Sequence, residues 1–413
     1  MKKLLMLGGA FSQVPAIKKA KKIGYYTITC DYLPENPGHA FADEYVNIST
    51  VDKEAVLGLA RSKDIDGIIA YASDPSAMTA AYVCDAMQIS GSTYESVQLL
   101  CEKDRFRDFQ KKNGFYTPDF YSISDLAQLD NMMEEIVYPC MVKPVDSSGS
   151  RGVKKTENRK QLEDAVKNAF QFSRCGRVII ERYIESHMNQ LHGDGIVVDG
   201  ELHFVALGEQ RFKDSVPIGT SFPARVEETL MERVYKEVSR VIRDSGYLYG
   251  GVNIEVRITA ENKICVVEIG PRTGGNYIPQ LMELATGEDE MMAALQIAMG
   301  ENCFIRMPKH LQYCFQYIIG SEEDGCFKGL YIDDYMREKV VDLYLHKKTG
   351  DWVNEYENSN GVVGVALLQF KNVEEMEMDI KNIKRHIRVL MEREEKKKKI
   401  SWQLLFLSHW LPV

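Results

Sequence analysis

Hydrophobic and polar positions alternate over the first 95 residues in the pattern of a small parallel sheet. Short apolar runs that end at glycine or aspartate are separated by stretches with helical spacing. The apolar runs predict strands, and the stretches between them predict helices. The expected strands are 4–7, 26–30 and 67–71, and the expected helices are 14–23, 54–61 and 75–87. This order predicts a parallel sheet with helices on both faces.

From residue 92 onward the pattern mixes helices with antiparallel strands. The pair Asp199-Gly200 lies between two apolar runs and is a strong signal for a two-residue hairpin. After residue 300 the chain reads mainly as alternating strands. The expected helices are 92–110, 161–170, 227–245, 288–299 and 373–395, and the expected strands include 138–144 and 178–184.

The length of 413 residues exceeds what one hydrophobic core normally organises, so several domains are expected. The fold class is α/β, with α+β character in the central domain. The predicted parts are a Rossmann-like domain at 1–95, a central domain at 96–300, a small α/β cap at 301–395 and a tail at 396–413. Within the central domain, a lid is expected at about 115–185 and a second subdomain at 186–300.

Composition and charge narrow the class of protein. The net charge of −9 argues against a nucleic-acid-binding protein, which needs a basic face. Nine cysteines are scattered without a Cys-x-x-Cys pair, which indicates reduced thiols and neither a disulfide framework nor a zinc site. The apolar run at the N-terminus is too short for a signal peptide. These features predict a cytoplasmic protein.

The last residues combine four lysines at 396–399 with a tryptophan- and leucine-rich segment at 400–413. Fourteen residues are too few to span a bilayer as a helix. A basic cluster beside such a segment is typical of weak contact with an anionic membrane surface. A packed terminal helix and an unstructured tail are the alternatives.

The strongest chemical signal is a pair of apolar, strand-like runs that each carry a glutamate. Glu255 stands in the run VNIEV, and Glu268 stands in VVEIGPRTGG, which continues to Arg272 and paired glycines. An acid in an apolar strand is costly unless it is paired or binds a metal. If both carboxylates point into one cleft, they could hold Mg²⁺ on a triphosphate, with Arg272 as the neutralising cation. The alternative is a surface hairpin with outward glutamates.

A lysine and a small-residue loop form a second candidate site. Lys143 lies near the end of the strand 138–144, and the loop 145–153 that follows is rich in serine and glycine. Backbone N–H groups of such a loop can surround phosphate oxygens, with the lysine as a point charge. The motif is not a Walker loop.

A third glycine-rich turn, Gly8-Gly9, opens a helix and raises the alternative of a nicotinamide dinucleotide site. Ala10 and Gln13 break the full glycine fingerprint, although Asp31 lies at about the distance of a ribose-binding acid.

Taken in order, these features resemble the ATP-grasp superfamily over about residues 1–300. They are a lysine on a helix, a lysine before a glycine loop, an acidic strand segment, and two acidic strands that end in arginine. The resemblance is to the carbamoyl-phosphate-synthetase-like branch, which has a Rossmann-like pre-ATP-grasp domain, an ATP-grasp domain and, in some members, a small α/β cap. It implies ATP and Mg²⁺ as cofactors, with Mn²⁺ as an alternative metal.

The resemblance also assigns roles by position. Lys103 and Lys143 would clamp the ATP phosphates, and Glu255 and Glu268 would bind the metal. The flap over the phosphates would comprise Ser148, Gly149, Ser150, Arg151 and Gly152, and the adenine slot would be lined by Glu181, Tyr183 and Ile184.

For catalysis, the resemblance implies that Arg272 steadies the transferred phosphoryl group, together with Lys143, and that Asn276 touches phosphate or substrate. Two positions depart from the family pattern. Gly270 stands where many relatives carry asparagine, and Gln190 stands where relatives often carry a ribose-binding glutamate. Glutamine can still hydrogen-bond a ribose hydroxyl.

The implied reaction is an ATP-dependent ligation in which a carboxylate becomes an acyl-phosphate and then an amide. Closure of the loop 146–153 would exclude water. Asp214 is a candidate general base, and Arg211 and Lys213 are candidates for holding a substrate carboxylate.

The partners implied are small-molecule carboxylate and amine substrates, with a homodimer as a family-level expectation. Three alternatives stay open, which are a bicarbonate-using biotin-carboxylase-like enzyme, a non-catalytic ATP-binding module and a dehydrogenase.

Overall fold

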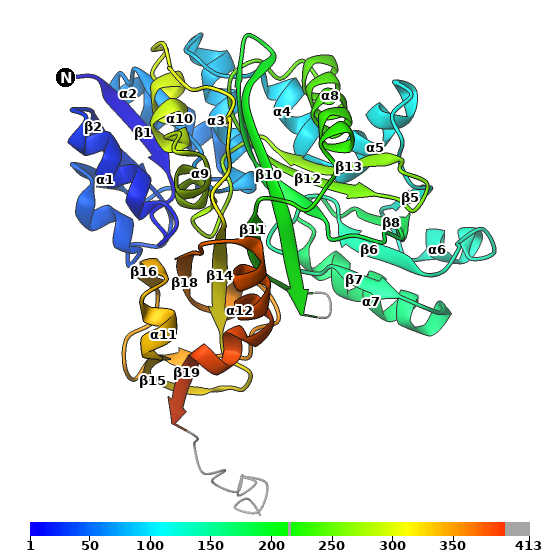
Figure 1. Ribbon diagram of the computed structural model, residues 1–413. Helices are drawn as coiled ribbons and strands as arrows, with labels where there is room; N and C mark the ends of the chain where they lie inside the picture. The colour runs from blue at the N-terminus through cyan, green and yellow to red at the C-terminus, as the bar shows by residue number, and fades with distance from the viewer. Residues whose placement is uncertain (214–215, 393–413) are drawn as a thin grey trace, which may run out of the picture.

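The computed structural model describes residues 1–213 and 216–392 (Figure 1). Its strands form four sheets, and helices cover their faces. The tail 396–413, with its predicted membrane contact, and Asp214 both lie outside the described residues. Among the described helices, none has the length and apolar character that crossing a bilayer requires.

The N-terminal sheet has the strand order β3-β2-β1-β4, and all of its strands are parallel. Leu4 and Met6 pack on one face of this sheet and Leu5 and Leu7 on the other, because side chains alternate along a strand. Helices therefore cover both faces, as the sequence predicts. The elements are β1 (Lys3–Leu7), α1 (Val14–Lys22), β2 (Tyr26–Cys30), η1 (Pro37–Phe41), β3 (Glu44–Val46), α2 (Lys53–Lys63), β4 (Gly67–Ile69) and α3 (Asp74–Met87).

The single long helix expected at 92–110 is wrong, because the chain forms two helices there. They are α4 (Tyr94–Cys101) and α5 (Lys103–Lys112), separated by Glu102 with an extended backbone at ψ 108°. The Glu102 carboxylate pairs locally with Arg105 and, across the fold, with Arg177, and a tertiary contact of this kind can override the local helical preference. The break places Lys103 at the first position of α5.

A small antiparallel sheet, with the order β5-β8-β6-β7, follows (Figure 1, cyan to green). Leu162 and Val166 of α7 pack on Val142 and Ile180 of the sheet. The loop 145–153 joins β6 to β7. The elements are β5 (Phe120–Ile123), α6 (Ala127–Met132), β6 (Cys140–Pro144), β7 (Lys154–Thr156), α7 (Arg159–Phe172) and β8 (Val178–Arg182).

The largest sheet is antiparallel and has the order β13-β12-β9-β10-β11-β14-β18-β16. The hairpin predicted at Asp199-Gly200 joins β9 to β10, with φ of 51° and 78° at its two turn residues. Helix α8 packs on one face of this sheet, and α9 and α10 pack on the other. The elements up to residue 300 are β9 (Leu191–Val198), β10 (Glu201–Lys213), β11 (Val216–Phe222), α8 (Glu228–Asp244), β12 (Gly250–Ile258), β13 (Ile264–Gly270), α9 (Ile278–Thr286) and α10 (Glu290–Ala298).

Three strands of the C-terminal region extend the same large sheet, so the sheet continues across residue 300. They are β14 (Cys314–Gly320), β16 (Val340–Leu345) and β18 (Val362–Gln369). A separate sheet has the order β17-β15-β19. The remaining elements are β15 (Gly325–Ile332), α11 (Asp334–Arg337), β17 (Trp352–Val353), η2 (Ser359–Gly361), α12 (Val373–His386) and β19 (Ile387–Glu392).

The helix expected at 373–395 is wrong in its second half. Helix α12 ends at His386, and the chain continues directly as β19. Ile387 is buried, and the strand pairs with β15. The pairing partner lies about 60 residues away in sequence, which local helical spacing does not reveal.

Candidate active site

Glu255 and Glu268 lie directly opposite each other in the antiparallel ladder between β12 and β13. Directly paired residues point to the same face of a sheet, so both carboxylates share that face. Burial and repulsion by Glu268 raise the pKa of Glu255 to about 7. The side-chain amide of Gln190 donates to Glu255 Oε2 at 2.8 Å. The pair is therefore an acidic site that a cation would stabilise.

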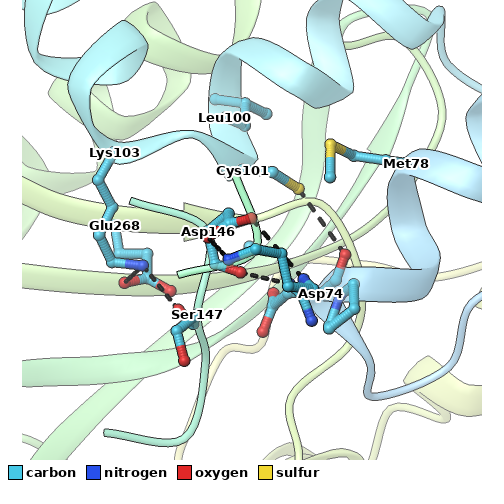
Figure 2. Close-up of a pocket in the computed structure, with 11 residues that line it drawn as sticks. Asp74, Met78, Leu100, Cys101, Lys103, Asp146, Ser147 and Glu268 are labelled. Carbon is cyan, nitrogen blue, oxygen red and sulfur yellow. Dashed lines mark hydrogen bonds and ion pairs between the residues drawn. The ribbon is translucent and has the colours of Figure 1, made fainter. Parts of the chain in front are cut away.

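Lys103 reaches this acidic site from the start of α5. Its Nζ donates to the carbonyl of Ser147 at 2.9 Å and lies 3.7 Å from Glu268 Oε2 (Figure 2). Burial lowers the pKa of Lys103, but Glu268 and Asp74 raise it by more, so the net shift is upward. The lysine therefore stays charged while it links the loop at Ser147 to the acidic strand.

Lys143 lies on β6 and is paired with a buried acid. Its Nζ donates to Glu181 Oε2 at 2.6 Å, and Arg107 Nε donates to Glu181 Oε1 at 2.8 Å. Burial raises the pKa of Glu181, but Arg107 and Lys143 outweigh it and lower the pKa to about 2. Glu181 thus uses both carboxylate oxygens to fix two cations, and its predicted place in an adenine slot stays a prediction.

Arg257 joins the other residues that the sequence assigns to the adenine slot and the ribose. Its Nη1 donates to the carbonyl of Ile184 at 3.0 Å, and its Nε donates to Gln190 Oε1 at 3.0 Å. Its guanidinium also lies 5.1 Å from the ring centre of Tyr183. Because Gln190 in turn contacts Glu255, this group is continuous with the acidic site.

The loop between β6 and β7 contains three residues with positive φ, which are Gly149, Ser150 and Gly152. Arg151 Nε donates to the carbonyl of Ser148 at 3.1 Å. A Cβ at Gly152 would lie 2.9 Å from Pro144 Cγ and from Phe172 Cδ2, so both space and backbone conformation require glycine there. The loop starts beside Lys103 through Ser147.

Arg272 follows β13, and its guanidinium lies near the same pocket. Its Nη2 donates to Asp74 Oδ2 at 2.6 Å, and its Nη1 donates to the carbonyl of Thr273 at 3.1 Å. Asp74, Lys103, Ser147 and Glu268 all line one pocket beside Arg272 (Figure 2). The structure therefore brings the predicted arginine, the helix lysine and the second glutamate together.

The sequence and the fold both match known proteins. A family model described as the ATP-grasp domain matches residues 108–276, the segment that carries Lys143, both glutamates and Arg272. The chain contains an ATP-grasp domain. The family and the fold are those that the sequence resemblance predicts.

Two curated relatives are about one quarter identical to this chain over the aligned residues. It is 26% identical over 321 residues to the uncharacterized protein y4rH of Sinorhizobium fredii, across 74% of this chain and 65% of that one. It is 24% identical over 315 residues to the carbamoyl phosphate synthase large chain of Thermotoga petrophila, across 74% of this chain and 28% of that one. The match thus covers less than two thirds of either relative.

The crystal structure of L-amino acid ligase from Bacillus licheniformis superposes on this chain with a TM-score of 0.81. The sequences are 21% identical, and the superposition covers 95% of this chain and 99% of that chain. The agreement at this low identity shows a shared fold from the N-terminal sheet to the C-terminal strands.

Several polar residues of the ATP-grasp domain escape the sequence reasoning. Asn253, which shares the sheet face of Glu255, donates from Nδ2 to Asp194 Oδ1 at 2.7 Å, and the N–H of Gly274 donates to Asp194 Oδ2 at 2.6 Å. Burial raises the pKa of Asp194 to about 6. Asn253 stands two residues before Glu255, so strand alternation alone could have placed it on this face.

The candidates for holding a substrate carboxylate already have acidic partners. Arg211 Nη2 lies 2.5 Å from Glu377 Oε1 of α12 and 3.2 Å from Glu209 Oε2. Lys213 lies 3.1 Å from Glu322. These contacts tie the β10–β11 hairpin to the C-terminal region, which explains both cations without a ligand.

The space around the glycine turn at Gly8-Gly9 is occupied by the side chains of Asp31 and His39. The N–H of Gly9 donates to Asp31 Oδ2 at 3.2 Å, and a Cβ at Gly9 would lie 2.2 Å from His39 Cε1. Asp31 thus accepts from the turn, and His39 covers it. This packing leaves no room for the pyrophosphate of a nicotinamide dinucleotide over Gly9.

Proposed function

We propose that this protein is an ATP-dependent ligase that activates a carboxylate as an acyl-phosphate and joins it to an amine, releasing ADP and phosphate. The observation that carries the proposal is a pocket lined by Lys103 and Glu268. Glu255 is paired with Glu268 across the ladder, and Arg272 donates to Asp74, which lines the same pocket. Pairs of acids and cations in this arrangement suit phosphoryl transfer, where catalysis is mostly positioning and charge neutralisation.

The residues present fit a magnesium ion bound together with nucleotide phosphates. The described residues contain no group of three histidine, cysteine or acidic side chains that would hold a metal by themselves. Mg²⁺ is commonly held by one or two carboxylates with substrate phosphates and water completing the shell. Glu255 and Glu268 would supply those two carboxylates, and burial together with repulsion by Glu268 raises the pKa of Glu255, so a bound cation would favour its charged form. When bound, the ion would neutralise charge on the phosphates.

Three cationic side chains of the site, those of Lys103, Lys143 and Arg272, each have a role in this proposal. Lys143, fixed by Glu181, and Lys103, fixed by Ser147, would bind phosphate oxygens. Arg272 would face the transferred phosphoryl group. The loop 146–153 would cover the phosphates and exclude water, which otherwise hydrolyses an acyl-phosphate.

The proposed ligation proceeds in two steps, which are formation of the acyl-phosphate and formation of the amide. A carboxylate oxygen of the acid attacks the γ-phosphorus of ATP, and the bond from that phosphorus to ADP breaks. The amine nitrogen then attacks the acyl carbon, the bond to the phosphate oxygen breaks, and the amine loses a proton. Asn276, adjacent to the Thr273–Gly275 turn, is proposed to contact the phosphate or the acid.

A screen of ADP release with Mg-ATP over pairs of carboxylates and amines tests the function, with bicarbonate included among the acids. We expect ADP release that requires both an acid and an amine, and its loss in Glu268→Gln. Release that depends on bicarbonate without an amine would instead assign the biotin-carboxylase-like alternative. ATP binding without ADP release for every pair would contradict the ligase.

A further inference from the structure

Asp74 delivers a carboxylate from the N-terminal sheet region to the active-site arginine. It is the first residue of α3, and it lies 198 positions before its partner in sequence. Its Oδ2 accepts from Arg272 Nη2 at 2.6 Å, and the side chains of Asp74 and Arg272 are only 18% and 11% exposed. The contact therefore joins two regions of the molecule. Asp74 itself lines the pocket together with Lys103 and Glu268 (Figure 2).

The backbone of β13 leaves a gap where this ion pair lies. A Cβ at Gly270 would lie 2.8 Å from Asp74 Oδ1 and 3.2 Å from Arg272 Cζ. Real Cβ atoms essentially never approach another heavy atom within 3.0 Å. Gly270 has no positive φ, so the backbone conformation does not demand glycine. The missing side chain at Gly270 instead provides space for the Asp74–Arg272 pair.

Asp74 differs from the acids that hold the two lysines. Glu268 pairs with Lys103 and is a proposed metal ligand. Glu181 pairs with Lys143 within the β5-β8-β6-β7 sheet. Asp74 has neither role. Burial raises its pKa, and Arg272 and Lys103 lower it by more, so it is ionised at neutral pH. It is thus a fixed anion that faces two cations of the site.

We propose that Asp74 is a positioning residue for Arg272, and that the absence of a side chain at Gly270 makes room for it. The inference rests on the proposed function, because it assigns Arg272 to the phosphoryl group. A guanidinium held in one orientation before the reaction stabilises developing charge without reorganising. Because Asp74 belongs to α3 and Arg272 to the loop after β13, the pair also couples the placement of Arg272 to the seating of the N-terminal sheet region.

Two single variants and their double variant test the proposal. Asp74→Asn keeps the shape and removes the charge, whereas Gly270→Ala keeps the charge and places a methyl group in its path. We expect each to lower the kcat of ADP release by about tenfold or more, since a single preorganised charge contributes at least that much. The dissociation constant for Mg-ATP should change less than threefold, and Asp74→Glu should recover part of the rate.

The double variant distinguishes a steric clash between the new methyl group and Asp74 from a non-specific loss of structure. In an Asp74→Ala background the closest obstacle, Asp74 Oδ1, is gone and only the looser approach to Arg272 remains, so Gly270→Ala should lower kcat little further, and the two effects should be strongly non-additive. Fully additive effects, or a Gly270→Ala protein with the wild-type rate, would overturn the proposal. A parallel fall in the melting temperature and in Mg-ATP affinity would also overturn it, because that pattern indicates structural loss.

A spectroscopic measurement keeps this inference distinct from the ligase proposal. The Nη resonances of Arg272, assigned by their absence in Arg272→Lys, should be protected from exchange in the wild-type protein, because Nη2 donates to Asp74. They should broaden or shift in both Asp74→Asn and Gly270→Ala. If the wild-type protein never binds Mg-ATP but these shifts occur, the ligase proposal fails while the fixation of Arg272 by Asp74 stands. Unchanged resonances in both variants would refute the fixation.

Discussion

Glu255 and Glu268 face each other across two neighbouring antiparallel strands, which places two carboxylates on one face of the central sheet. Glu268 has Lys103 at 3.7 Å, whereas Glu255 is contacted by the neutral amide of Gln190. The charge of Glu255 is therefore the less compensated of the two, and its pKa is raised to about 7. A carboxylate whose pKa is raised in this way is typical of a functional site that binds a cation.

Glu255→Gln is predicted to stabilise the metal-free protein. The substitution removes a buried charge and its repulsion with Glu268, and the gain should be about 1 kcal/mol in the free energy of unfolding. Thermal melts in the presence of a chelator measure it, with the exposed Glu95→Gln as a control. The same variant should lose the stabilisation that Mg-ATP gives the wild-type protein. A lower melting temperature in chelator would contradict the uncompensated charge.

Arg107→Met is predicted to destabilise the fold strongly. Arg107 is 1% exposed and donates to Glu181, Gln110 and the carbonyl of Val267. Removing it leaves Glu181 buried with Lys143 as its remaining cation, which should cost about 3–5 kcal/mol. Urea denaturation measures the loss. The matched control is Arg105→Met, because Arg105 is 54% exposed in its ion pair and should change stability by about 0.5 kcal/mol or less.

Lys143→Ala is predicted to weaken Mg-ATP binding and also to destabilise the fold, because it removes one of the two cations that pair with the buried Glu181. Lys143 is held by Glu181 and lies at the base of the loop 145–153, where a phosphate-binding cation is proposed. Loss of one charge-assisted contact of about 1.5–3 kcal/mol corresponds to a roughly 10- to 150-fold higher dissociation constant. Calorimetric titration checks it, with the exposed Lys160→Ala as the matched control. Equal affinities in both variants would remove Lys143 from the site.

Glu290→Gln is predicted to change the pH dependence of stability. Burial and the nearby Asp194 raise the pKa of Glu290 well above its usual value, and burial raises the pKa of Asp194 to about 6. Raised folded-state pKa values mean that the folded state binds more protons than the unfolded state. These acids therefore contribute stability at low pH that is lost as pH rises through their folded-state pKa values. The stability of Glu290→Gln relative to wild type should increase between pH 5 and pH 8. A flat difference would refute the linkage.

The strand and helix order of the N-terminal sheet, the Asp199-Gly200 turn and the acidic pair are predictable because their signals are local. Alternation along β12 and β13 allows Glu255 and Glu268 to share a face, and the register that pairs them directly comes from the structure. By the same rule, Asn253 could have been included.

Other features depend on residues that are distant in sequence. Arg107 lies in the charged run KDRFR, and its side chain is buried because Glu181 of β8 accepts its hydrogen bond. The partner of Arg272 lies on α3, and no spacing rule connects Asp74 with it. The change from α12 to β19 at Ile387 likewise depends on pairing with β15.

The most direct test of the central claim is a calorimetric titration of the full chain with ATP, with and without Mg²⁺. We predict saturable, magnesium-dependent binding in the micromolar range for the wild-type protein. The double variant Glu255→Gln/Glu268→Gln should keep its fold and lose the magnesium dependence. Identical magnesium-dependent affinities in the wild-type protein and the double variant would contradict the account.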